Sequence, residues 1–67
     1  MKHITNYSKE EFFDMFKALP HDVVKIVYDY LHRDKTYSVS RFAISKHIST
    51  STLYRYIDRV KREYKRR

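Results

Sequence analysis

The scarcity of turn-forming residues is the strongest constraint on this chain. Its 67 residues include no glycine and one proline, and Asn6 is the single asparagine. Folds rich in β-strands reverse direction through tight turns, which usually require glycine, asparagine or proline. We therefore expect an all-α fold. The absence of glycine also excludes the glycine-rich loops that hold the phosphates of bound nucleotides.

The chain contains no cysteine, so packing alone must hold the fold together. Disulfides, thiol nucleophiles and cysteine-ligated zinc are all excluded. A chain of this length is expected to form one domain over residues 1–67, with a core too small to spare many buried residues for chemistry. We expect no enzymatic activity and no cofactor.

Neither a metal site nor a membrane segment is indicated. The four histidines are not spaced by three or four residues, as two ligands on one helix face would be. No apolar run exceeds three residues, and the longest are 26–28 and 42–44. A membrane-spanning helix or a secretory signal needs a much longer run. We expect no bound metal, no membrane partner and a cytoplasmic location.

The formal net charge of +7 is unevenly distributed along the chain. Residues 1–34 carry five basic and six acidic groups, a net charge of −1, and residues 35–67 carry ten basic and two acidic groups, a net charge of +8. A near-neutral half joined to a strongly basic half suggests a scaffold that carries a polyanion-binding surface. The alternative for the last few residues is a solvated basic tail.

Capping residues and apolar periodicity predict a compact domain of four helices. Ser8 and Glu11 form a capping-box pattern, and Pro20 ends the helix that begins there. The second helix is apolar around most of its circumference, so it is either the central helix of the domain or in part a dimer or partner surface. Ser38 and Ser49 are suited to cap the third and fourth helices. The predicted helices span about 9–18, 21–32, 39–46 and 50–64.

Residues 39–60 have the pattern of a helix-turn-helix. A short helix is followed by a turn of about three residues and by a second helix with a basic outer face. Ala43 would allow the two helices to cross closely, and Ile48 would fill the space below the turn. The remaining inward positions of this motif are Phe42, Leu53 and Tyr56.

The same residues resemble a known family, the C-terminal promoter-binding domain of bacterial sigma factors, called sigma-70 region 4. Similar domains occur in small transcription regulators of phages and mobile elements. The resemblance covers residues 17–66, and the chain has no room for the other domains of a sigma factor. It is carried by Leu19-Pro20, by Ser38 to Ala43 and by Ile48-Ser49-Thr50-Ser51-Thr52-Leu53-Tyr54-Arg55.

The resemblance implies that the fourth helix enters the major groove of DNA. It further implies base contacts from Thr50, Ser51, Tyr54 and Arg55, with Arg59 and Arg62 directed towards phosphates. Lys46 joins the predicted DNA-binding set, although it stands where the family usually has an apolar residue. His47 stands where the family usually has a left-handed glycine, a conformation that histidine tolerates better than most residues do.

The chemistry of the fourth helix suits DNA without reference to any family. An arginine such as Arg55 makes bidentate contacts with guanine, and hydroxyls at a helix N-terminus favour a phosphate oxygen. The alternative is a solvated basic helix that is stabilised by pairs such as Asp58 with Arg62.

Two functions remain open at this stage. The first is a DNA-binding transcription regulator, whose partner is double-stranded DNA and which we expect to act as a homodimer or beside a second protein. The second is a protein-interaction module that binds RNA polymerase or another transcription factor without needing DNA. The predicted interface residues of such a module are Phe13, Val24 and Tyr28.

Overall fold

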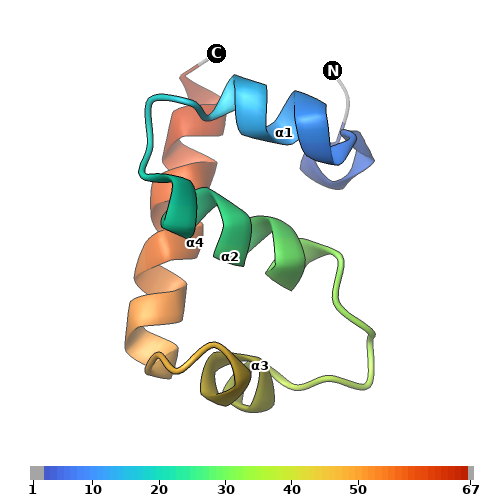
Figure 1. Cartoon of the computed structure of the whole chain (residues 1–67), viewed down its shortest axis with the longest axis vertical. Coiled ribbons are helices and arrows are strands. Elements are labelled where there is room, and N and C mark those ends of the chain that lie inside the picture. The colour runs from blue at the N-terminus through green and yellow to red at the C-terminus, as the bar shows by residue number, and fades with distance from the viewer. Residues whose placement is uncertain (1–2, 67) are drawn as a thin grey trace.

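The computed structural model describes residues 3–66 and is built from helices (Figure 1). A 3-10 turn, η1 (Ile4–Asn6), precedes four α-helices, which are α1 (Lys9–Met15), α2 (His21–Leu31), α3 (Val39–Ser45) and α4 (Thr50–Lys65). The described residues contain no strand, which confirms the prediction of an all-α fold. Lys2 and Arg67, both included in the charge distribution, lie outside the described residues.

Serine side chains begin three of the four α-helices, as predicted. The Ser8 hydroxyl accepts a hydrogen bond from the Glu11 amide at 3.2 Å, and the Glu11 carboxylate accepts one from the Ser8 amide at 2.9 Å. Ser38 and Ser49 each accept a hydrogen bond from the backbone amide three residues further on. Each cap satisfies an amide that has no partner inside its helix.

The first helix is shorter than the predicted range of 9–18. It ends at Met15, and the chain turns through residues 16–18. Leaving the helix here places the Phe16 ring between Phe12, 4.8 Å away between ring centroids, and Tyr64 of α4, 6.4 Å away. Both phenylalanines are completely buried. The chain therefore packs against α4 at the point where the last predicted turn of α1 is missing.

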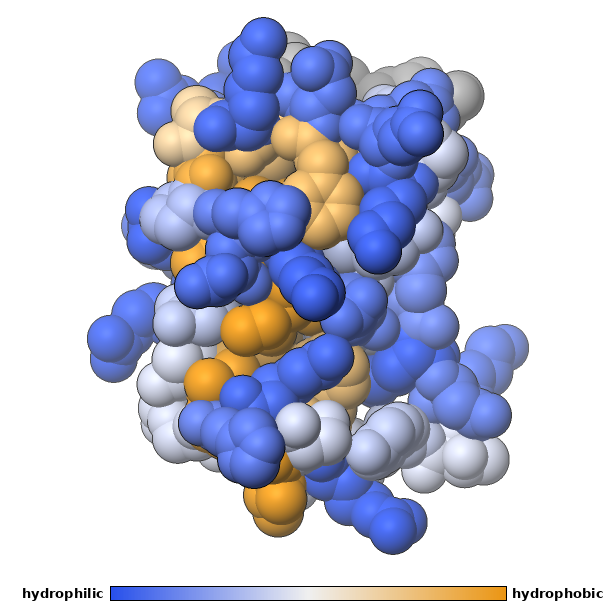
Figure 2. Space-filling model, viewed as in Figure 1, coloured by the Kyte–Doolittle hydropathy of each residue, from blue (hydrophilic) through white to orange (hydrophobic). Residues whose placement is uncertain are grey.

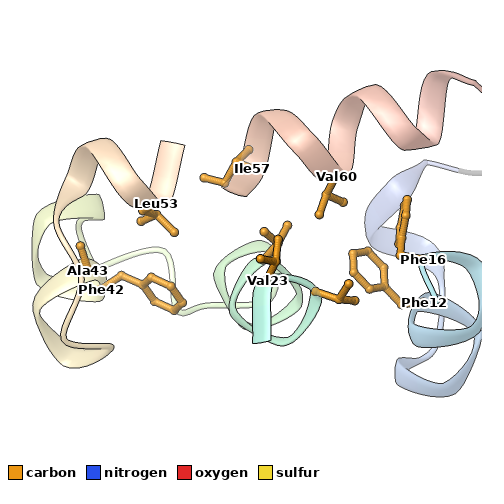
Figure 3. Packing of buried hydrophobic residues seen from close by; sticks show 10 residues of the cluster. Phe12, Phe16, Val23, Phe42, Ala43, Leu53, Ile57 and Val60 are labelled. Carbon is orange, nitrogen blue, oxygen red and sulfur yellow. The ribbon is translucent and has the colours of Figure 1, made fainter. Parts of the chain in front are cut away.

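The central position of α2 explains why its sequence is apolar on most sides. It packs against both α1 and α4, while α3 packs against α4. Val23, Val24 and Val27 supply its buried side chains. Figure 3 shows Val23 between the phenylalanines of α1 and the inner side chains of α4. The complete core consists of Phe12, Phe16, Val23, Val24, Val27, Phe42, Ala43, Leu53, Ile57 and Val60.

Tyrosines surround this core and connect the ends of the chain to it. Tyr28 meets the Phe12 ring edge-on at 5.3 Å, and Tyr30 meets Phe42 at 5.7 Å. At the N-terminal end, Tyr7 lies edge-on against Tyr64 at 6.2 Å. A hydrogen bond with the Tyr7 side chain raises the pKa of the Tyr64 hydroxyl above its ordinary value. This pair fixes the chain before α1 to the last turns of α4.

The connection between α3 and α4 depends on a residue in a left-handed conformation. His47 has a φ of 60°, as its position in the sequence predicted, and no other described residue has a positive φ. The Ile48 amide then donates a hydrogen bond to the Ala43 carbonyl at 3.1 Å. Ile48 itself is half-buried against the core. The turn is therefore anchored by both backbone and side chain.

Replacing His47 with glycine should stabilise the fold. A residue with a Cβ atom loses about 1 kcal/mol in the left-handed region, a cost that glycine does not have. We expect His47→Gly to raise the free energy of unfolding by up to about 1 kcal/mol, measured by urea denaturation followed by circular dichroism. Ser40→Gly, on the exposed side of α3, is the matched control and should destabilise. A His47→Gly variant less stable than the parent would contradict this account of the turn.

Candidate nucleic-acid interface

One face of α4 is buried and the opposite face is polar and exposed. Leu53, Ile57 and Val60 point into the core. Because side chains three and four residues apart share a helix face, the residues opposite them form one stripe. That stripe consists of Ser51, Arg55, Asp58 and Arg62, all of them exposed. The core thus fixes the direction in which this stripe faces.

The arginines of α4 differ in whether a carboxylate neutralises them. Arg62 Nε lies 2.8 Å from Asp58 Oδ2, which is the pair expected of a solvated basic helix. Across the described residues, Arg55 and Arg59 take part in no ion pair. They are therefore the two predicted contact residues whose charge is most available to an anion, whereas Arg62 would first have to leave Asp58.

The N-terminal turn of α4 presents hydroxyl groups and an aromatic ring to solvent. Thr50 and Ser51 are exposed, while Ser49 is occupied as the cap and also bonds the Thr52 hydroxyl at 2.9 Å. One turn further on, the Tyr54 side chain is 56% exposed. Thr50, Ser51, Tyr54 and Arg55 are thus brought together at one end of the helix, as predicted.

Lys46 does not belong to this exposed face. Its Nζ lies 3.0 Å from Asp29 Oδ2 of α2, and each of the two side chains is 32% exposed. The amino group also lies over the Phe42 ring, 5.5 Å from its centroid. DNA contact by Lys46 stays a prediction, and the lysine is less available for it because a carboxylate distant in sequence draws its charge towards α2. The apolar stem of the side chain follows the core edge where an apolar residue was expected.

Two exposed residues of α3 were not singled out from the sequence. Arg41 is exposed, and the Ile44 side chain is 72% exposed although isoleucine is usually buried. Val39, Phe42 and Ala43 define the inward face of this helix, and helical spacing then puts Arg41 and Ile44 on the outside. The helical spacing of the sequence could have identified both residues as exposed. Residues 42–44 form a continuous apolar run, however, which hides the outward position of Ile44.

A hollow of 290 Å³ lies beside α3, lined by Asp34, Thr36, Tyr37 and Arg41. The Thr36 amide and hydroxyl each donate a hydrogen bond to Asp34 Oδ1 at 2.9 Å. These bonds, the amide first, hold the pKa of the Asp34 carboxyl below its ordinary value. The loop between α2 and α3 is therefore ordered by a local turn in which Asp34 stays ionised.

The predicted protein interface is only partly at the surface. Phe13 and Tyr28 are half-buried and lie 6.2 Å apart between ring centroids. Tyr28 is further enclosed by Phe12 and by the His32 ring, 4.3 Å away. Val24 is 1% exposed, so its assignment to a partner surface was wrong, because the core covers its side chain. Phe13 and Val24 both line a surface hollow, and Phe13 is the more exposed of the two.

Within residues 3–66, no group of three or more histidine, aspartate or glutamate side chains could hold a metal ion. Two of the histidines stack on aromatic rings, His21 on Phe13 at 4.9 Å and His32 on Tyr28. None of the described helices has the length and apolar character that crossing a bilayer requires.

Comparison with known proteins finds no matching family, no matching curated protein and no matching solved structure. The resemblance to sigma-70 region 4 accordingly rests on the residues of this chain alone.

The ion pair between Asp29 and Lys46 should contribute measurably to stability. Both side chains are about one-third exposed, so solvent screening limits the expected coupling to about 0.5 kcal/mol. A double-mutant cycle with Asp29→Ala and Lys46→Ala, followed by urea denaturation, measures it. The more exposed Asp58 and Arg62 pair is the control and should give a smaller coupling. A coupling of zero between Asp29 and Lys46 would show that α2 does not hold this lysine.

Proposed function

We propose that this protein is a small DNA-binding transcription regulator whose helix-turn-helix comprises α3, residues 46–49 and α4. The observation that carries the proposal is the pair of exposed, unneutralised arginines, Arg55 and Arg59, on a helix whose other face is held by the core. Rigid placement matters because base recognition depends on the position of a few side chains.

The dimensions of α4 suit the major groove. Its 16 residues correspond to a length of about 24 Å, and the groove of B-DNA, about 12 Å wide, admits one helix. In this arrangement Arg55 reaches the N7 and O6 atoms of a guanine. Thr50 and Ser51, at the N-terminus of the helix, meet a phosphate or a base edge. Tyr54 lies beside them, and Arg59 turns towards the backbone.

The charge distribution supports the same orientation. The half of the sequence that contains α3 and α4 carries a net charge of +8. A basic surface of this kind attracts duplex DNA at any sequence and accelerates the encounter. Because one short reading helix gives limited affinity, we expect a homodimer or a neighbouring DNA-bound protein to complete the complex.

Reversing the charge of the two arginines that take part in no ion pair tests this proposal. Arg55→Glu with Arg59→Glu should weaken binding to duplex DNA by at least about 30-fold, because attraction to a base and to a phosphate becomes repulsion. The slope of the logarithm of the binding constant against the logarithm of the salt concentration should also become less steep, by about 0.9 per lost phosphate contact. Fluorescence anisotropy over a salt series measures both quantities.

Reversing the charge of one lysine in α1 and one in α2 provides the matched control. Lys9→Glu with Lys25→Glu changes the net charge by the same amount at exposed positions outside α4 and should alter DNA affinity much less. Equal losses in the two double variants would indicate attraction by net charge alone. DNA binding that does not fall with salt would refute the proposal.

The protein-interaction module remains the second candidate, favoured by one observation. The half-buried Phe13 ring borders a surface hollow between α1 and α2, away from the basic face of α4. Regulatory activity that survives the arginine reversals but fails in Phe13→Ser would favour the module as the sole function. Val24 and Tyr28 are unsuited to this experiment because substitution there damages the core.

A further inference from the structure

A second surface lies along the junction of α1 and α2. Two adjoining hollows of 260 and 370 Å³ share Phe13 and His21, whose rings stack 4.9 Å apart. We call the two hollows together the α1–α2 groove. In Figure 2, apolar side chains are visible between α1 and α2, surrounded by hydrophilic ones. Besides the shared pair, the groove is lined by Lys9, Glu10, Phe16, Lys17, Leu19, Val24 and Lys25.

The floor of the groove is apolar and belongs to the core. Phe16 and Val24 lie beneath it in the core, at 0% and 1% exposure. Phe13 and Leu19 are half-buried and pack against this core from the groove side. Because α1 ends at Met15 and the chain turns away, no further helical turn covers these side chains. The groove can therefore accept an apolar side chain without rearrangement of the core.

The rim of the groove is positively charged, although this half of the chain is close to neutral. Lys9, Lys17 and Lys25 are all exposed and all line the groove, against the single carboxylate of Glu10. None of the three lysines takes part in an ion pair among the described residues.

Several other charged groups of this half are engaged elsewhere. The Glu11 carboxylate caps the Ser8 amide, and the Asp29 carboxylate pairs with Lys46. The Arg33 guanidinium donates hydrogen bonds to the backbone carbonyls of Tyr30 and Tyr37. The carboxylates of Glu10, Asp14 and Asp22 likewise take part in no ion pair among the described residues, but only Glu10 of these lines the groove. Three lysines and one carboxylate therefore surround its apolar hollow.

We propose that the α1–α2 groove binds an acidic segment of a partner protein. An apolar side chain of that segment enters between Phe13, Leu19 and His21, and carboxylates on either side of it meet the three lysines. An apolar anchor surrounded by a charged rim is the usual anatomy of a specific interface. No residue of α3 or α4 lines the groove, so DNA and the partner can be held at the same time.

A protein segment fits this surface better than an anionic membrane does. Helices that lie on membranes present a continuous apolar face that penetrates the lipid. Here the apolar side chains are recessed in hollows of 260 and 370 Å³ beneath the lysines, where an inserted side chain reaches them and a lipid surface does not.

A set of matched peptides tests the proposal. The probe is a fluorescein-labelled peptide in which phenylalanine and leucine stand between short runs of glutamate. Two companions replace either the apolar pair by serine or the glutamates by glutamine. We expect each companion to bind at least about tenfold more weakly in anisotropy titrations, because anchor and charge both contribute. Amide shifts in NMR spectra should map to the groove residues of α1 and α2.

Charge reversals in the protein separate the groove from the basic face of α4. Lys17→Glu with Lys25→Glu should weaken binding of the parent peptide about tenfold. Lys35→Glu with Lys61→Glu, which has the same net charge, should change it little. Phe13→Ser should also weaken binding, and its folding is checked by thermal denaturation. Because these titrations contain no DNA, failure of the DNA proposal would leave their outcome unaffected.

Four results would overturn the groove proposal. They are equal affinity for the serine companion, NMR shifts confined to α4, displacement of the peptide by duplex DNA in the parent protein, and lysine-dependent binding to phosphatidylserine vesicles without binding to the peptide.

Discussion

The fold depends on the burial of one short, valine-rich helix between two others. α2 packs against α1 on one side and α4 on the other, and Val23, Val24 and Val27 fill the space between them. In a chain of this size the core is small, and these three side chains, which meet both α1 and α4, fix how the two helices are oriented around α2. The basic stripe of α4 faces solvent because Leu53, Ile57 and Val60 are committed to the core.

Local chemistry made most of the helical framework predictable. The serine caps, Pro20 directly before α2 and the left-handed residue at His47 each act within a few residues, so the sequence itself contains the information. The exposed end of α4 was predictable for the same reason, since helical spacing alone separates Thr50 and Arg55 from the buried side chains. These elements agree with their local propensities, which is the usual mark of a sequence that folds readily.

What the sequence did not reveal depends on contacts between distant residues. The ion pair of Lys46 could not be predicted, because only the fold brings Asp29 within 3.0 Å of it. Val24 was taken as a surface residue because periodicity leaves α2 apolar on most sides without showing which sides are covered. The early end of α1 has the same origin, since the chain leaves the helix where the Phe16 ring packs against Tyr64 of α4.

The charge asymmetry acquires a more specific meaning in three dimensions. A net charge of −1 over residues 1–34 suggested a near-neutral scaffold. Three lysines of that half nevertheless line the α1–α2 groove, where Glu10 is the single carboxylate. In the basic half, Asp58 pairs with Arg62, so that Arg55 and Arg59 are the arginines of α4 that take part in no ion pair among the described residues. Net charge per segment therefore pointed to the half that we propose binds DNA but did not reveal the lysines around the groove, because a sum over a segment does not show where its charges lie once the helices pack.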